Sequence, residues 1–189
     1  LESRTKTPHK DDHIKLYTHN ENVDSINEEA FQKLKGEIRS FHMTTKGKAS
    51  IVETLKKNCL APEVLNLKIG AKVICIKNAQ DRSYVNGSMG EVTSFDKDGS
   101  PVVILLNGKR VTILPDSWKI EEEGKVRAEL QQLPLRLAWA ITVHKSQGMT
   151  IDKAEIDLSR AFASGQGYVA LSRLTSLDGL YLKGFTKQA

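Results

Sequence analysis

The chain has 189 residues, of which 39% are hydrophobic, enough for one large domain or two small ones with a buried core. Its formal charge of +5 favours a polyanionic partner such as nucleic acid, although a modest excess also serves solubility alone. No apolar run is long enough to cross a bilayer and no leader pattern opens the chain, so a membrane partner is not expected.

The two cysteines, Cys59 and Cys75, lack the spacing of metal ligands and have no partner motif. We expect reduced thiols and no metal site, which fits an intracellular protein. Its compartment would be the cytoplasm in a bacterium and the nucleus or a mitochondrion in a eukaryote. The chain begins with Leu1 and not with methionine, so we expect it to be a piece of a longer protein.

The first predicted elements follow a polar connector at residues 1–13. A short strand at 14–18 leads to a turn, and Asn22 can cap a helix that ends near Gly36. Ligands of α/β domains gather where strands end, so Thr18 and His19 in this turn are site candidates. The alternative is an ordinary polar turn whose side chains satisfy local backbone groups.

The region between residues 37 and 62 is expected to begin with a strand at 37–43. It then turns basic and mixed, with a short helix over 50–58. We interpret residues 44–62 as a surface excursion and its lysines as a solvated face, not as dedicated DNA contacts.

From residue 65 the pattern changes to period two, which is typical of strands. Residues 72–77 predict a strand buried on both faces. Asn107 and Gly108 join apolar runs at 102–106 and 110–114 and predict a hairpin. Several short strands with tight turns indicate a small barrel over 65–130, inserted into an α/β domain formed by 14–64 and 131–189.

After residue 131 the pattern returns to α/β. We predict a helix-like segment over 137–146, which ends at Gly148 and carries a dense polar cluster: Thr142, His144, Lys145, Ser146 and Gln147. A strand at 154–158, a helix from Ser164 or Gly165, and a strand at 179–185 follow, as a parallel sheet requires. Arg173 stands at the polar end of that helix, where a fixed guanidinium fork recognises phosphate. The alternative for His144 and Lys145 is a solvated helix end.

Three segments resemble motifs V and VI of superfamily-one helicases, specifically the PIF and RecD-like DNA helicases. They are residues 144–150 (HKSQGMT), 162–166 (FASGQ) and 168–173 (YVALSR). Residues 16–20 (LYTHN), with Val23, Asp24 and Asn27, are similar to motif IV. The resemblance implies the second RecA-like motor domain, and residues 85–92 (VNGSMGEV) resemble part of an SH3-like β-barrel set into it.

The resemblance also implies roles for individual residues. Arg173 would be the arginine finger on the γ-phosphate of ATP. Gln147 and Gly148 would face the nucleotide, and Gln166 would support the finger helix on that side. Single-stranded DNA would be contacted by the remaining candidates: Thr18, His19, Thr142, His144, Lys145, Lys77 and Tyr84.

The sequence contains no phosphate-binding loop of the form Gly-x4-Gly-Lys-Ser/Thr and no acidic pair suited to Mg²⁺. We therefore expect ATP and Mg²⁺ to be gripped by an N-terminal motor domain of the same protein, and this chain alone to be inactive. The leading hypothesis is the C-terminal motor half of an ATP-dependent 5′–3′ DNA helicase of DNA repair or recombination. Two alternatives stay open: a stand-alone nucleic-acid-binding module, and a regulatory chain that supplies Arg173 in trans.

Overall fold

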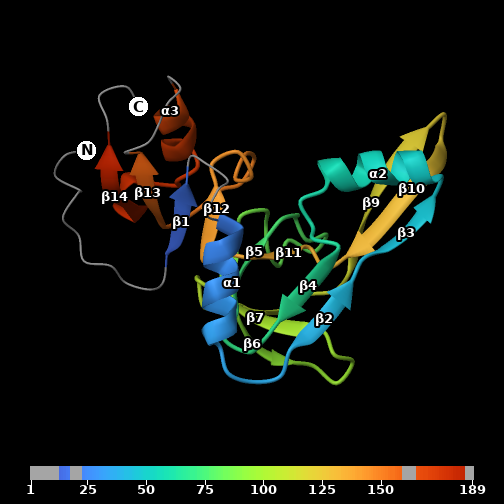
Figure 1. The fold of residues 1–189 in the computed structure, drawn as a ribbon, viewed down its shortest axis with the longest axis horizontal. Coiled ribbons are helices and arrows are strands. Elements are labelled where there is room, and N and C mark those ends of the chain that lie inside the picture. Colours follow the sequence, from blue (N-terminus) through green and yellow to red (C-terminus); the bar gives the residue numbers. More distant parts are fainter. Residues whose placement is uncertain (1–12, 18–22, 159–164, 186–189) are drawn as a thin grey trace. The chain divides into compact units, whose positions relative to one another are not determined.

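The computed structural model describes residues 13–17, 23–158 and 165–185 (Figure 1). The chain divides into two compact units. Unit 1 comprises residues 1–33, 86–88 and 137–189, and unit 2 comprises residues 34–85 and 89–136. Among the described helices, none has the length and apolar character that crossing a membrane requires.

Unit 1 is built on a four-stranded parallel sheet in the order β12-β1-β13-β14. Its strands are β1 (Ile14–Tyr17), β12 (Ala140–Thr142), β13 (Ala154–Leu158) and β14 (Leu180–Phe185). The sheet interior is apolar and nearly inaccessible to water, as the parallel arrangement requires: Ile14, Leu16, Ile141, Ile156, Leu180 and Leu182 are buried. The strands predicted at 14–18, 154–158 and 179–185, and the parallel sheet they form, are confirmed.

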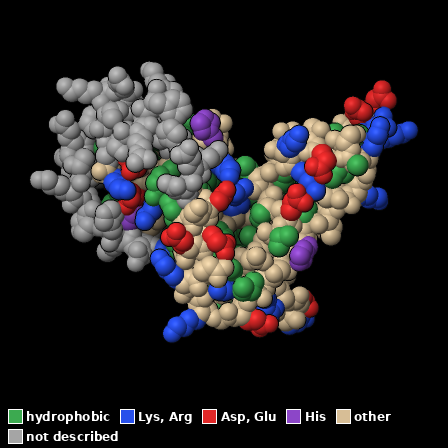
Figure 2. Space-filling model, in the orientation of Figure 1, with side chains coloured by type: hydrophobic (Ala, Val, Ile, Leu, Met, Phe, Trp, Pro, Cys, Tyr) green, Lys and Arg blue, Asp and Glu red, His purple; other side chains and the backbone are tan. Residues whose placement is uncertain are grey.

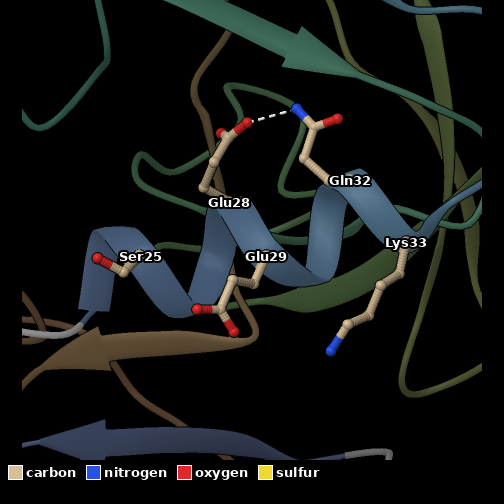
Figure 3. Close-up of a pocket in the computed structure, with 5 residues that line it drawn as sticks. All are labelled: Ser25, Glu28, Glu29, Gln32 and Lys33. Carbon is tan, nitrogen blue, oxygen red and sulfur yellow. Dashed lines mark hydrogen bonds between the residues drawn. The ribbon is translucent and has the colours of Figure 1, made fainter.

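Helix α1 (Val23–Lys33) lies beside β12 in unit 1 (Figure 1). Val23, Asn27 and Phe31 recur every fourth residue and form its buried stripe. The outward face is polar and lines an open, shallow hollow in which Glu28 and Gln32 point toward each other (Figure 3). Unit 1 also holds α3 (Gln166–Leu171), which confirms the predicted helix, and a 3-10 turn at Leu177–Gly179.

The helix predicted over 137–146 is wrong. These residues form the end of β11 (Leu135–Leu137), then β12, and then a series of turns over 143–148. Strand β12 pairs with β1, and the Val143 N–H extends the pairing by donating to the Tyr17 carbonyl at 2.9 Å. A short apolar run buried on both faces has no period of its own, so sequence alone does not separate a strand from a buried helix here.

Unit 2 contains two small antiparallel sheets that pair residues 39–47 with strands lying almost entirely within the 65–130 region predicted as a barrel. Strand β2 (Arg39–His42) pairs with β4 (Val64–Leu67), and β3 (Thr44–Gly47) pairs with β10 (Lys125–Gln132), which also pairs with β9 (Asp116–Glu122). Helix α2 (Ala49–Asn58) packs on this second sheet around four buried side chains: Val52, Leu55, Ala128 and Leu130. The strand predicted at 37–43 and the helix predicted at 50–58 are confirmed.

The third sheet of unit 2 has five strands in the order β11-β5-β6-β7-β8. Its remaining strands are β5 (Lys72–Cys75), β6 (Met89–Phe95), β7 (Pro101–Leu105) and β8 (Arg110–Thr112). The hairpin predicted at Asn107 and Gly108 joins β7 to β8, and the Leu105 N–H closes it on the Lys109 carbonyl at 2.8 Å. The β-rich character of this region is confirmed, while its closure into an SH3-like barrel stays a prediction.

The unit boundaries differ from those expected from the sequence. Residues 34–64 were expected to join the motor domain, but the structure groups them with unit 2. The reason is long-range pairing: β3 adds to β10, and β2 adds to β4.

Candidate functional site

The polar cluster predicted from the sequence lies in a loop that follows a parallel strand. We call residues 143–150 the polar loop. It leaves the sheet where β12 ends, beside the end of β1, because the register pairs Tyr17 with Thr142. The carboxyl ends of parallel strands are where α/β domains bind ligands. The polar loop is therefore correctly placed to be a binding element.

Part of the cluster shapes the loop itself. Thr142 is buried, and its hydroxyl accepts the Lys145 N–H at 3.2 Å while its carbonyl accepts the Ser146 N–H at 3.0 Å. Ser146 is also buried, and its hydroxyl donates to the Val143 carbonyl at 2.8 Å. These hydroxyls replace backbone partners that the turn would otherwise leave unsatisfied. Thr142 and Ser146 therefore hold the loop and do not present their hydroxyls to solvent.

The remaining members of the cluster are accessible. His144, Gln147 and Gly148 are exposed. The Lys145 ammonium lies 4.0 Å from the Asp24 carboxylate, and because that carboxylate is 79% exposed, the pair holds the lysine only weakly. Gly148 has a φ of +75°, with open space where a side chain would stand. The loop thus offers an imidazole, an amide, an ammonium and bare backbone to a ligand.

Arg173 follows the end of helix α3. The residue that precedes this helix, Gly165, has a left-handed backbone conformation. The Arg173 Nε donates to the Val169 carbonyl at 3.2 Å, and one Nη donates to the Ser172 hydroxyl at 3.1 Å. The side chain is half-buried, and its fork offers more N–H donors than these two bonds use. The guanidinium is held in place and keeps the capacity to bind an anion.

The polar loop and Arg173 are joined through the residue that follows the loop. The Ile151 N–H donates to the Arg173 carbonyl at 2.9 Å, and the Thr175 N–H donates to the Ile151 carbonyl at 3.1 Å. Ile151 and Leu174 thereby form a parallel bridge. The two segments singled out in the sequence are consequently connected by backbone hydrogen bonds within unit 1.

The other two described candidates, Lys77 and Tyr84, belong to unit 2. The Lys77 ammonium donates to the Ser117 carbonyl at 2.6 Å, pairs with the Asp116 carboxylate at 2.9 Å and lies over the Trp118 ring. Tyr84 is 8% exposed, and burial raises the pKa of its hydroxyl to about 12.

Three candidates cannot be placed. Thr18 and His19 lie outside the described residues, as does the side chain of Gln166. The described residues contain no group of three or more His, Cys, Asp or Glu side chains that could hold a metal ion.

Charge alone does not mark the site. On the face shown in Figure 2, lysines and arginines are interspersed with aspartates and glutamates. The ladder of β9 and β10 shows the same mixing, with Lys119 3.5 Å from Glu129 and Arg127 3.3 Å from Glu122. Exposed pairs of this kind contribute little to stability, and on this ladder the opposite charges offset each other.

Sequence reasoning missed two contacts of this region. Asn27, which was noted only for its resemblance to motif IV, hydrogen-bonds the backbone of Ala140 with both ends of its amide. Asn86 donates to the Gly148 carbonyl at 3.3 Å. An Asn-Gly dipeptide is a turn signal, and it carries no information about a partner 62 residues away.

Comparison with known proteins identifies Pif1 helicases among the relatives of this chain. A family model described as "DNA helicase Pif1, 2B domain" matches residues 51–95. The ATP-dependent DNA helicase Pif1 of Psychrobacter sp. is 41% identical to this chain in an alignment over 221 residues. The match covers 90% of this chain and 34% of the relative. The chain thus spans about a third of the length of that relative.

Solved structures agree with the sequence match. Unliganded Pif1 from Bacteroides sp. superposes with a TM-score of 0.81 at 33% identity, covering 94% of this chain and 42% of that one. A structure of Bacteroides Pif1 helicase in complex with ADP-AlF3 and ssDNA gives a TM-score of 0.66 at 30% identity, covering 96% and 42%.

Proposed function

We infer the function of this chain from what the comparisons establish: it is a Pif1-like helicase sequence that spans part of the length of such proteins. We propose that it forms the C-terminal, RecA-like motor half of an ATP-dependent DNA helicase that moves 5′ to 3′ on single-stranded DNA, with residues 65–130 providing an SH3-like insertion. The N-terminal motor domain is the proposed partner, and DNA repair or recombination is the proposed setting.

The observation that carries this proposal is the backbone connection between the polar loop and Arg173. A finger that stabilises charge on the γ-phosphate must sit at a fixed distance from the residues beside the nucleotide. Ile151 provides such a link, because it follows the polar loop directly and pairs with the Arg173 carbonyl. We propose that Gln147, Gly148 and Gln166 face the nucleotide.

ATP is the proposed substrate, and Mg²⁺ would neutralise phosphate charge when bound. The described residues do not fit a metal site, so we assign the metal to the N-terminal motor domain. What this chain supplies is the guanidinium of Arg173, held by the Val169 carbonyl and the Ser172 hydroxyl. Its sequence has no phosphate-binding loop motif, so we expect the chain alone to hydrolyse no ATP above background.

Single-stranded DNA is the proposed nucleic-acid partner, because the Bacteroides relative forms a complex with ssDNA. His144 and Lys145 are the best-supported contacts because they are accessible in the polar loop. Thr142 acts in this scheme by shaping the loop, since its hydroxyl is engaged there. Thr18, His19, Lys77 and Tyr84 complete the proposed contacts, with Lys77 and Tyr84 acting from unit 2.

The proposal is tested in a chimera in which this chain replaces the corresponding segment of the Psychrobacter helicase. Arg173→Ala is expected to lower the DNA-stimulated turnover of ATP by about 10³-fold or more, the usual contribution of an arginine finger. Arg173→Lys keeps the charge without the fork and should restore only a small part of it. Arg127→Ala is the matched control, because Arg127 lies on β10 in unit 2 and its guanidinium pairs at the surface with the Glu122 carboxylate.

Two results would contradict the proposal. One is a loss of turnover by Arg173→Ala that is no larger than the loss by Arg127→Ala. The other is ATP hydrolysis by the isolated chain that Arg173→Ala abolishes, because a finger without a cradle has nothing to complete.

A further inference from the structure

The Asn86-Gly87 dipeptide lies against the end of the polar loop. Residues 86–88 group with unit 1, although Val85 before them and Met89 after them group with unit 2. We propose that Asn86 and Gly87 are positioning residues: they hold residues 148–150 in the shape that presents Gln147 and Gly148. The identity of the ligand rests on the proposed function, whereas the positioning of the loop by these two residues does not.

Gly87 approaches the loop too closely for any other residue. A Cβ at this position would lie 2.4 Å from the Thr150 carbonyl oxygen and 2.7 Å from the Thr150 nitrogen. Both are backbone atoms, which cannot move aside as the end of a flexible side chain can. Gly87 also has a φ of +96°, which disfavours a side chain independently. Any substitution here must displace Thr150 or the turn that carries residue 87.

Asn86 makes the second contact two residues earlier in the loop. Its Nδ2 donates to the Gly148 carbonyl at 3.3 Å, and Gly148 itself has a left-handed φ of +75°. The contacts of Asn86 and Gly87 therefore bracket Met149, whose side chain is buried. Ile151, which follows Thr150, is hydrogen-bonded to the backbone of Arg173. Residues 148–150 are thus held at one end by the dipeptide and at the other by the segment of the proposed finger.

A second Asn-Gly dipeptide in the chain shows that turn formation does not explain these contacts. Gly108 also has a positive φ, +82°, but nothing lies within 4 Å of where its Cβ would be. Asn107 accepts a hydrogen bond from the Lys109 N–H at 3.0 Å within its own hairpin. The two dipeptides have the same local chemistry and differ in their long-range partner. This makes Asn107 and Gly108 matched controls for Asn86 and Gly87.

The consequence is that residues 86 and 87 influence ligand binding through the loop. The loop amides of Ser146, Met149 and Ile151 are each hydrogen-bonded within unit 1 and should exchange slowly with solvent. Loss of the dipeptide contacts should release them while the hairpin between β7 and β8 keeps its protection.

The experiment uses the full chain and two readouts, amide hydrogen exchange of a peptide spanning 143–151 and titration with a fluorescently labelled single-stranded oligonucleotide. Gly87→Ala is expected to speed exchange in this peptide by about tenfold or more, as local release of a held segment does. It should also weaken oligonucleotide binding several-fold. Gly108→Ala should leave both readouts at the wild-type level and change exchange only near its own hairpin.

Asn86 provides a test that survives if Gly87→Ala fails to fold. Asn86→Asp keeps a residue that favours a turn before glycine but removes the N–H donor to the Gly148 carbonyl. If Asn86 only forms a turn, Asn86→Asp matches wild type. If it positions the loop, Asn86→Asp resembles Asn86→Ala, with faster exchange at 143–151 and weaker binding, and Asn107→Asp does neither.

The outcomes separate this inference from the proposed function. Equal exchange at 143–151 in Gly87→Ala and Gly108→Ala, or wild-type exchange in Asn86→Asp, would overturn the inference. Faster exchange with unchanged oligonucleotide affinity would overturn its link to binding. If the wild-type chain binds no oligonucleotide while exchange responds as expected, the positioning role stands and the proposed DNA contact fails.

Discussion

Asn27 carries the docking of α1 on the sheet of unit 1. Its side chain, on a residue that is 8% exposed, donates to the Ala140 carbonyl at 2.9 Å and accepts the Ala140 N–H at 2.9 Å. Strand β12 is the edge of the parallel sheet, so the outward backbone of Ala140 has no neighbouring strand. The amide of Asn27 takes the place of that strand. Replacement by alanine leaves a buried donor and a buried acceptor unsatisfied.

The expected cost follows from these two groups. Ala140 is 1% exposed, so water does not reach it without local opening. Each unsatisfied buried group costs about 1–3 kcal/mol. Alanine is the better helix former by about 0.5 kcal/mol, which offsets a small part of the loss. We expect Asn27→Ala to lower the free energy of unfolding of unit 1 by about 3 kcal/mol, a large fraction of the stability of a small domain.

The measurement is urea unfolding followed by the fluorescence of Trp139, which neighbours Ala140. A Trp118→Phe background removes the second tryptophan, which lies in unit 2. Gln32→Ala is the control, because Gln32 lies on the outward face of the same helix and contacts Glu28 (Figure 3). It should change stability by no more than about 0.5 kcal/mol. A loss below about 1 kcal/mol for Asn27→Ala would refute the reasoning, because it would mean that Ala140 finds other partners.

Two further predictions concern unit 2. Gln132 is 3% exposed, and its Nε2 donates to the Phe41 and Pro62 carbonyls at 3.0 Å each. Gln132→Ala leaves these buried carbonyls without their donor and should lower the free energy of unfolding of unit 2 by about 2–4 kcal/mol. An unchanged midpoint of urea unfolding would contradict this prediction. Burial raises the pKa of the Cys75 thiol from 9.0 to about 12, so less of it is thiolate in the folded chain than in the unfolded chain. Its contribution to stability is therefore fully present below pH 9 and is lost as the pH rises toward 12. At pH 9 iodoacetamide should label Cys75 only after unfolding, and equal labelling of folded and unfolded chain would show that the thiol is not protected.

Sequence patterns correctly predicted those helices and turns that are specified by a few consecutive residues. The Asn107-Gly108 hairpin is specified by turn chemistry between two apolar runs, and α2 by its helical period. The segment expected at the surface over 44–62 is largely exposed, but sequence reasoning did not show that it also pairs and packs with residues far along the chain. Gly47 pairs with Ala128, and Val52 and Leu55 pack on Leu130. No local period reports a partner at such a separation.

The candidate site shows the same division between local and long-range information. The density of polar residues after an apolar run indicated a functional loop, and the loop does follow a strand of the parallel sheet. The sequence did not distinguish hydroxyls that shape the loop, such as those of Thr142 and Ser146, from groups that face solvent, such as the His144 imidazole. Burial makes that distinction, and burial depends on residues elsewhere in the chain.

The way Arg173 is held bears on how its substitution should be interpreted. Its backbone, and not its guanidinium, makes the pairing with Ile151, and the neighbouring bridge is formed by Leu174. The side-chain bonds of Arg173 return to Val169 and Ser172, within the end of its own helix. Arg173→Ala therefore removes the charge and the fork while leaving the backbone link to the polar loop in place. If that variant loses turnover while amide hydrogen exchange at 143–151 stays at the wild-type level, the loss is due to the missing guanidinium and not to a disordered polar loop.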